Sequence, residues 1–430
     1  MIGRIVGTIA LTAALVAAVG APASAQTVRE AFEDLYVFGE CGEPVCLDVA
    51  ASVHGQHFSA LAEQAGTDMI GFVFRSISAG LASVPIPSSS ATEVFYFQDG
   101  TLVSERSSAG PIFLERSQTL GQGNLLVGFN VGRISPSNLR GRSLEDLELN
   151  FTHEDVGTAG LGDPDWENDV IRVTTDVSLD LTLFSLFATY GLTNSVDFTA
   201  ALPIVNSSLS GVSQARIVPF SGATTPHAFL VNGERSLTST SSSDISSTGI
   251  GDVVLRAKAN LRQDEALGVG GLVELRLPTG DEDDFHGTGE TTLRALAVVS
   301  RPFEVVTPHL NGGFTFRSGE NSASSVTLRG GFDALLGEAV TGSVEVLGEF
   351  LVEEVADDAV TRTEQYQFPV QRTFDVSDIP DIEDHIMDFV AGLKYQASNR
   401  FRVVGSVLVP MLDGGVRPDV QWSLGVESVF

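Results

Sequence analysis

The side chains with the clearest potential for chemistry are four consecutive acids, Asp281, Glu282, Asp283 and Asp284, followed closely by His286. Carboxylate oxygens are hard ligands of the kind that Ca²⁺ prefers. The spaced Asp-x-Asn-x-Asp-Gly pattern of a dedicated calcium loop is absent, which favours a solvated acidic loop instead. If a metal site exists, Asp281, Asp283 and Asp284 are its candidate ligands. The sequence predicts no cofactor.

Motifs of established catalytic chemistry are missing. Gly249-Ile250-Gly251-Asp252 has closely spaced glycines, but it precedes alternating strand residues and lacks the lysine and the helix that phosphate binding needs. No Gly-x-Ser-x-Gly elbow occurs, and no histidine has a serine and an acid at recognisable spacing. The chain is predicted not to be an enzyme. A hydrolase is kept as a minor alternative, because catalytic triads need not be local in sequence.

A second set of side chains is charged and confined to one face of alternating segments. From Val253 to Leu261 every second residue is apolar, and Arg256 and Lys258 stand on the opposite parity. Successive side chains of a β-strand point to opposite faces, so these segments have one apolar and one charged face. The charged set comprises Arg256, Lys258, Glu274, Arg276, Arg294, Glu345, Glu349, Lys394, Arg400 and Arg402.

The elements that must carry this set are antiparallel strands of about ten residues. The alternation continues to the end of the chain, where Trp422, Leu424 and Val426 share one face and Phe430 is the last residue. No run of about 18 apolar residues follows Ala25, which excludes a helical membrane protein. Together with short turns that alternate with long polar loops, the pattern predicts an all-β fold, a transmembrane antiparallel β-barrel of about 14 strands, with 12 as the alternative.

The strand count depends on weaker segments. Strand ends can be placed from Arg133 onward, including one near His153, and a further strand within residues 93–118 gives an even number, as bacterial single-chain barrels have. A long polar loop is predicted over residues 206–247. Between Leu179 and Tyr190 the parity of the apolar residues changes, which predicts a β-bulge or a buried apolar patch of the lumen.

The N-terminal part of the sequence has a different pattern. Arg4, the apolar run from Ile5 to Val19, and Ala23-Ser24-Ala25 have the layout of a secretory signal peptide, residues 1–25, that is cleaved after Ala25. Residues 26–90 are predicted to form a periplasmic or plug segment with a helix, because residues 55–83 show a helical period. Residues 91–430 are assigned to the barrel. Whether the N-terminal segment enters the lumen or packs under the barrel is left open.

Two further global features limit the partners. Cys41 and Cys46 are the two cysteines of the chain, and a local disulfide is predicted because oxidation is allowed in an exported protein, whereas zinc would need four ligands. The formal net charge is −30 at pH 7. Phosphate binding needs a basic surface, so nucleic acid is excluded as a partner.

Several short motifs together resemble a known family. They are Tyr190-Gly191-Leu192-Thr193, Val196-Asp197-Phe198, Ala201-Leu202-Pro203, Thr248-Gly249-Ile250-Gly251-Asp252 and Leu277-Pro278-Thr279-Gly280-Asp281. This combination resembles the MetA-pathway phenol-degradation family, mainly over residues 175–300. The resemblance implies an outer-membrane barrel that helps small apolar molecules to cross the membrane, and it implies no catalytic residue. A barrel with an N-terminal plug is also remotely similar to the long-chain fatty-acid transporters of the outer membrane, without a motif match.

These observations predict an outer-membrane channel of a Gram-negative bacterium for passive uptake of small, aromatic or otherwise apolar solutes. The alternatives are a structural or surface-interaction barrel with a closed lumen, and an outer-membrane hydrolase. Expected partners are outer-membrane lipid and lipopolysaccharide, the barrel-assembly machinery through Phe430, and the small apolar solute. The charged set is then predicted to line the lumen, where charges pair between neighbouring strands or tune permeation.

Overall fold

The computed structural model describes residues 26–40, 67–68, 70–77, 93–98, 101–106, 108–152, 169–219, 227–263, 267–319, 322–352, 363–366, 372–398 and 400–430. The predicted signal peptide, Cys41 and Cys46 lie outside these residues. Of the segment 55–83, residues 70–77 are described as a continuous helix, in agreement with the predicted helical period. No helix in the described parts is both long and apolar enough to cross a membrane.

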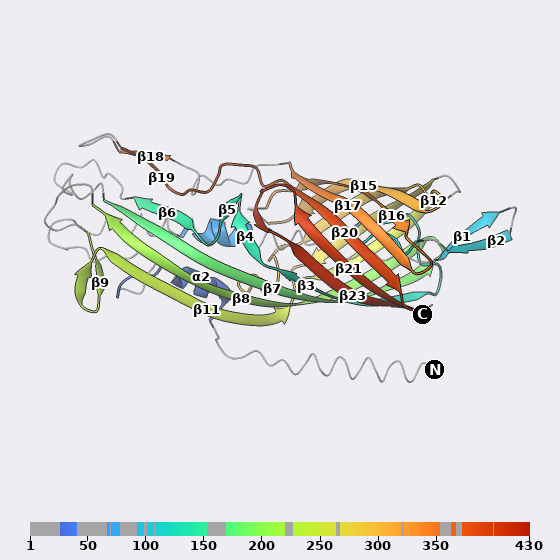
Figure 1. Cartoon of the computed structure of the whole chain (residues 1–430), viewed down its shortest axis with the longest axis horizontal. Helices are drawn as coiled ribbons and strands as arrows, with labels where there is room; N and C mark the ends of the chain where they lie inside the picture. The colour runs from blue at the N-terminus through green and yellow to red at the C-terminus, as the bar shows by residue number, and fades with distance from the viewer. Residues whose placement is uncertain are drawn as a thin grey trace.

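Antiparallel strands close on themselves to form a barrel (Figure 1). Within the described residues twelve strands make this ring, and β8 closes it by pairing with both β12 and β7. In ring order the strands are β3 (Leu125–Ile134), β7 (Val170–Thr193), β8 (Val196–Val218), β12 (Val253–Gln263), β13 (Gly268–Leu277), β14 (Thr292–Ser300), β15 (Val306–Arg317), β16 (Ser325–Leu335), β17 (Val340–Leu351), β20 (Ile386–Gln396), β21 (Phe401–Pro410) and β23 (Gln421–Val429). The predicted all-β barrel is confirmed.

The ring has the smaller of the two predicted strand numbers. β6 (Leu147–Thr152) and β11 (Thr238–Ile250) bring the whole sheet to 14 strands, but they pair with the parts of β7 and β8 that are remote from the turn joining them. The strand predicted within residues 93–118 is not part of the barrel. β1 (Glu93–Gln98) and β2 (Thr101–Arg106) pair only with each other, and the ring begins at Leu125 rather than at residue 91.

The remaining strands form small separate sheets outside the ring. They are β4 (Pro136–Leu139) with β5 (Arg142–Ser143) and β22 (Val416–Pro418), β9 (Phe229–Val231) with β10 (Glu234–Ser236), and β18 (Thr363–Tyr366) with β19 (Arg372–Asp375). Except for β5, each of these strands has three or four residues, so none is long enough to cross a bilayer.

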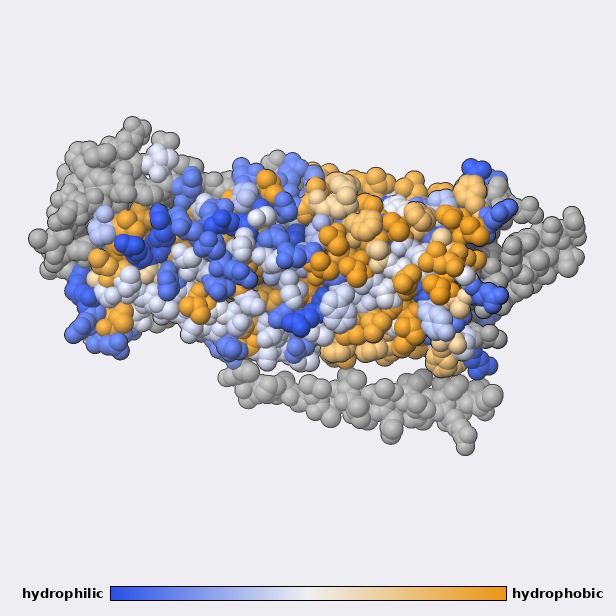
Figure 2. Space-filling model, in the orientation of Figure 1, coloured by the Kyte–Doolittle hydropathy of each residue, from blue (hydrophilic) through white to orange (hydrophobic). Residues whose placement is uncertain are grey.

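The outer surface of the ring carries an apolar band. On the face shown in Figure 2, hydrophobic residues gather over the half of the molecule nearest the C-terminus, and the other half is mostly hydrophilic. Leu310, Phe314 and Phe316 on β15, and Trp422 and Leu424 on β23, are large apolar side chains that remain exposed. An exposed apolar band around a closed ring is the surface that a bilayer interior requires. The ring is therefore the membrane-spanning part.

β7 and β8 are much longer than a membrane crossing requires. The 24 residues of β7 span roughly 80 Å at about 3.3 Å per residue, whereas a tilted transmembrane strand needs about 10 residues. Their excess length pairs with β6 and β11 to form a four-stranded sheet, the extension sheet, that projects from the barrel (Figure 1, left). The polar loop predicted over residues 206–247 is thus largely strand. The prediction was wrong because serine and threonine occupy both faces of β11, which removes the apolar alternation.

The polarity of β7 inverts along its length. Phe184 and Tyr190 face outward and are exposed, whereas in the extension sheet the inward positions are apolar and buried, as with Val177 and Leu179. The pairing of β7 with β8 shows no register shift across this region, so the predicted β-bulge is wrong. The alternative prediction, an inward apolar patch, is confirmed for the fully buried Leu181. The inversion follows from the surroundings of each part of β7. In the ring, the outer face contacts hydrocarbon and the inner face lines the lumen. In the extension sheet, the outer face contacts water and the inner face packs against an apolar core.

The N-terminal residues supply that core. α2 (Val28–Asp34) and the helical residues 70–77 pack on the inner face of the extension sheet, and Phe32, Leu35 and Phe74 are buried there with apolar residues of β7 and β8. Gly211 permits this approach, because a Cβ at that position would lie 2.9 Å from Leu35 Cδ1. Residues 26–40 therefore lie toward the end of the molecule opposite Phe430 (Figure 1).

Candidate functional site in the barrel lumen

Most of the predicted charged set faces the inside of the ring. Eight of its members are buried there: Arg256, Lys258, Glu274, Arg294, Glu345, Glu349, Lys394 and Arg402. Arg276 is half-buried on the inward parity of β13. Arg400 is exposed and was assigned to the lumen wrongly. β21 begins one residue later, at Phe401, so Arg400 belongs to the turn that precedes the strand.

The lumen is occupied by residues 108–120, here called the lumen segment. This segment runs from the β1–β2 hairpin to β3, and its side chains are mostly buried. It contacts inward-facing residues of many strands: Asp197 on β8, Arg256 and Lys258 on β12, Ser300 on β14, Asn311 on β15, Asp333 on β16, Glu345 on β17 and Lys394 on β20. Among the described residues, the part of the N-terminal region that occupies the lumen therefore lies after residue 90, beyond the segment 26–90 predicted as a possible plug.

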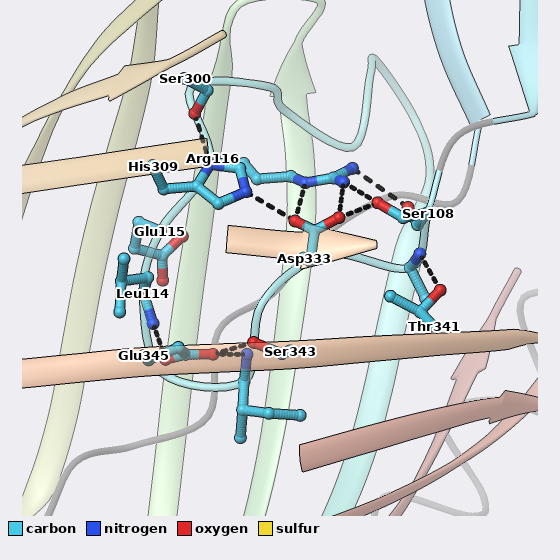
Figure 3. A network of polar contacts seen from close by, with 12 residues as sticks. Ser108, Leu114, Glu115, Arg116, Ser300, His309, Asp333, Thr341, Ser343 and Glu345 are labelled. Carbon is cyan, nitrogen blue, oxygen red and sulfur yellow. Dashed lines mark hydrogen bonds and ion pairs between the residues drawn. The ribbon is translucent and has the colours of Figure 1, made fainter. Parts of the chain in front are cut away.

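One carboxylate of the wall binds the middle of the lumen segment. Glu345 accepts hydrogen bonds from the backbone N–H groups of Ile112, Phe113 and Leu114, the last two at 2.9 Å. Ser343 donates to the same carboxylate at 2.6 Å (Figure 3). A carboxylate that accepts several backbone N–H groups makes stronger bonds than a neutral acceptor. Glu345 thus fixes three consecutive peptide groups of the segment to β17.

A second carboxylate binds both ends of a loop in the lumen segment. Asp333 accepts from Arg116 at 2.8 Å and from Ser108, and His309 Nε2 lies 2.6 Å from its other oxygen. His309 also lies 2.9 Å from Ser300 (Figure 3). Because Arg116 and Asp333 are almost completely buried, breaking this pair by removing one partner would leave an uncompensated charge.

Glu115 of the lumen segment is bound from three directions. Its carboxylate lies 2.7 Å from Arg256 Nη1 and 3.2 Å from Lys258 Nζ. The side-chain amide of Asn311 accepts from the backbone N–H of Glu115 at 2.7 Å and donates to its carbonyl at 3.0 Å. A buried carboxylate is tolerated when it is both paired and hydrogen-bonded. Glu115 therefore places its negative charge between two cations of β12.

Apolar contacts complete the fit on the opposite wall. Ile112, Phe113 and Leu114 form a buried cluster with Leu347, Val390, Val404 and Leu408. Gly392 leaves room for this cluster, because a Cβ on it would lie 2.5 Å from Ile112 Cγ1. The cluster is small, so polar contacts dominate the attachment of the lumen segment.

Beyond the segment, the wall charges pair with one another. Glu274 binds Arg256 at 2.5 Å and Arg294 at 3.2 Å. Glu349 binds Arg294 at 3.4 Å and also binds Arg317. The result is a chain of alternating charges along neighbouring strands, which is the pairing predicted from the sequence.

The candidate metal ligands have another role. Asp284 accepts from the backbone N–H of Val28 at 2.9 Å, and Asp283 pairs with Arg29, so both hold the first turn of α2. A carboxylate at a helix N-terminus satisfies an otherwise unpaired N–H and opposes the helix dipole. The described residues contain no group of three or more side chains that could hold a metal ion. The loop of Asp281, between β13 and β14, thus docks the N-terminal helix.

The same loop supplies a testable pH dependence. His286 inserts beside Gly249 and lies 3.4 Å from Ser207 Oγ, and burial lowers its pKa below the usual 6.5. The docked loop favours neutral His286, so docking is fully stable above pH 6.5 and weakens as the pH falls below it. We expect hydrogen exchange in residues 279–288, corrected for intrinsic rates, to be faster at pH 5.5 than at pH 7.5. The variant His286→Gln should lose this difference, and equal protection of the wild-type loop at both pH values would contradict the assignment.

Several residues of the site were not predicted. Asp333, His309 and Arg329 lie on strands whose alternation is weak in sequence, since glycines take outward positions on β15 and β16. Glu115 and Arg116 carry no periodic signal at all. The outward run Val326, Leu328 and Phe332 would have identified the inward parity of β16, but nothing local indicates which wall residues bind the lumen segment.

Similarity to known proteins is low. No family model matches the chain, so the resemblance to the MetA-pathway phenol-degradation family is not confirmed, and no curated protein sequence matches. Among solved structures, the COG4313 outer membrane channel from Pseudomonas putida F1 is 12% identical, with a TM-score of 0.40, covering 73% of this chain and 98% of that one. The CymD monoaromatic hydrocarbon channel is 9% identical, with a TM-score of 0.33, covering 72% and 89%. A Pseudomonas aeruginosa FadL homologue is 10% identical, with a TM-score of 0.29, covering 71% and 89%. TM-scores this low support no conclusion on their own.

Proposed function

We propose that this protein is a channel of the Gram-negative outer membrane through which small solutes, aromatic or otherwise apolar ones among them, pass passively. The supporting observation is a closed ring that is apolar outside and lined inside by charged and hydroxyl side chains. A wall of this kind suits a hydrated interior. A segment held mainly by polar contacts then sets the width of that interior.

The nature of those contacts favours a movable constriction. Water can replace the wall groups that bind Glu115, Arg116 and residues 112–114, so the net stabilisation from each hydrogen bond is modest, about 0.5–1.5 kcal/mol for neutral pairs and more for charged ones. The N-terminal residues on the extension sheet are held differently, by a continuous apolar core. We infer that the lumen segment moves while α2 stays in place.

A closed structural barrel is the second candidate, and the same contacts favour it. The lumen segment reaches wall residues from β8 to β20, and a segment attached at so many points could fill the ring permanently. The two candidates differ in whether the wild-type protein, with the segment intact, admits solutes.

Liposome swelling separates them. We expect liposomes that contain the protein to swell in small neutral solutes, and to swell faster when residues 110–118 are replaced by a Gly/Ser sequence of the same length. Heat-modifiable gel mobility of both proteins controls for assembly of the barrel. If the wild-type protein admits no solute, whether or not the variant does, the structural candidate replaces the channel.

Export and assembly complete the proposal. We infer removal of residues 1–25 after Ala25, contact of the outer surface with outer-membrane lipid and lipopolysaccharide, and recognition of Phe430 by the barrel-assembly machinery. Phe430 is 62% exposed while its backbone pairs with Leu125, which leaves its ring available at the end of the barrel. Mass spectrometry of the mature N-terminus tests the cleavage.

A further inference from the structure

Arg329 on β16 is an arginine of the lumen wall that has no partner among the described residues. Its side chain is 8% exposed and faces the lumen. Among the described residues, none lies within hydrogen-bond or ion-pair distance of its guanidinium group. A guanidinium carries five N–H donors, and leaving them unsatisfied in a buried place is costly. Such a group needs water or a ligand.

The charges around Arg329 explain why it is unpaired. Two guanidinium groups, Arg294 and Arg256, and two carboxylates, Glu349 and Glu274, act on it. Glu274 is bound by Arg256 and Arg294, and Glu349 by Arg294, Arg317 and Ser325. Glu274 and Glu349 are therefore already bound by three other guanidinium groups, and Arg329 is a fourth. Neither carboxylate forms an ion pair with Arg329.

The guanidinium also borders space that protein atoms do not fill. Some side-chain nitrogen and oxygen atoms of the described residues are fully enclosed and have no hydrogen-bond partner. No atom of Arg329 is among them. Its nitrogens therefore touch accessible space even though the residue as a whole is buried. An anion held in that space would contact them directly.

A second arginine without a hydrogen-bond partner among the described residues stands at the end of the ring nearest the extension sheet. Arg276 lines a cavity of about 50 Å³ together with Leu181, Leu183, Pro203, Val205, Asp252, Phe285, His286, Gly287 and Thr288. The carboxylate of Asp252 is used by the N–H groups of Gly280 and Thr288. Apolar side chains on one side and a guanidinium on the other suit a molecule with an apolar body and an anionic group. The cavity is too small to enclose such a molecule and can serve only as its entrance.

We propose that Arg329 is a binding site for small organic carboxylates with an apolar body, and that Arg276 receives them at the entrance. A carboxylate matches the planar fork of a guanidinium with two parallel hydrogen bonds. It would pair with the guanidinium of Arg329, which forms no ion pair with any described residue of the wall. This proposal rests on the proposed channel function, because the solute must enter the lumen.

Calorimetric titration of the purified protein in detergent, with sodium benzoate at low ionic strength, tests the site apart from transport. We expect benzoate to bind and benzyl alcohol, its neutral counterpart, to bind more weakly. Arg329→Gln should weaken benzoate binding by about tenfold or more, the loss expected for a charge-assisted hydrogen-bonded pair. Arg329→Lys, which keeps the charge but loses the fork, should give an intermediate loss.

Arg133→Gln is the matched control, because Arg133 is an exposed arginine of β3 that pairs with Asp180 away from the lumen. It should leave benzoate binding unchanged. Equal benzoate affinity in the wild type and Arg329→Gln, or no binding by the wild type, would overturn the site. Binding that depends on Arg329 in a protein that gives no liposome swelling would support the site and refute the channel, so the two failures are distinguishable.

Discussion

Replacement of Glu345 by alanine should open the lumen. Glu345 is fully buried and accepts from three consecutive backbone N–H groups of the lumen segment. Its loss leaves those groups without an acceptor as long as the segment stays in place, and each such group costs about 1–3 kcal/mol. A total of about 3 kcal/mol raises the detached population of the segment by roughly a hundredfold. Planar-bilayer recordings of Glu345→Ala should therefore show a much larger fraction of time in the open, high-conductance state.

Glu349→Ala is the control for that measurement. Glu349 lies on the same strand and the same inward face, but it binds Arg294 and Arg317 of the wall rather than the lumen segment. We expect it to change ion selectivity while leaving the open fraction near that of the wild type. Equal open fractions for Glu345→Ala and the wild type would show that the segment is not what limits the conductance.

The second large effect is expected in the extension sheet. Val177→Asp puts a carboxylate at a position that is 3% exposed in the apolar core under α2. Burial of an unpaired charge is strongly unfavourable, so we expect the packing of α2 on the sheet to lose roughly 3 kcal/mol or more. Hydrogen exchange in residues 26–40 should become much faster. Heat-modifiable mobility should persist, because the ring pairs β7 from Leu181 onward, beyond this position.

The neighbouring residue provides the comparison. Ser178 is exposed on the outward face of the same strand, so Ser178→Asp should leave exchange in residues 26–40 unchanged. Faster exchange in Val177→Asp and unchanged exchange in Ser178→Asp would demonstrate that the inward face of β7 is the apolar one in the extension sheet. If both variants behaved like the wild type, α2 would not depend on the inner face of the extension sheet.

The sequence alone determined the features that depend on residues close together in the chain, namely which side chains of a strand face inward and that the strands form a barrel. Alternation along β12 and β13 placed Arg256, Lys258 and Glu274 inside the ring, because side-chain direction in a strand repeats every two residues. The same period, continued to Phe430, was sufficient to predict a barrel. The error at Arg400 has the same origin: parity does not show where a strand begins.

The tertiary structure decided what depends on contacts between distant residues. The ring closes with twelve strands because β6 and β11 pair beyond the membrane-spanning part of β7 and β8, and strand partners are not encoded in local alternation. Glu345 binds Phe113 across 232 residues of sequence. Arg329 has no partner among the described residues, because the two carboxylates that act on it bind other arginines. Which charged side chains pair depends on which of them lie close together in the folded protein. The residues next to each one in the sequence do not indicate this.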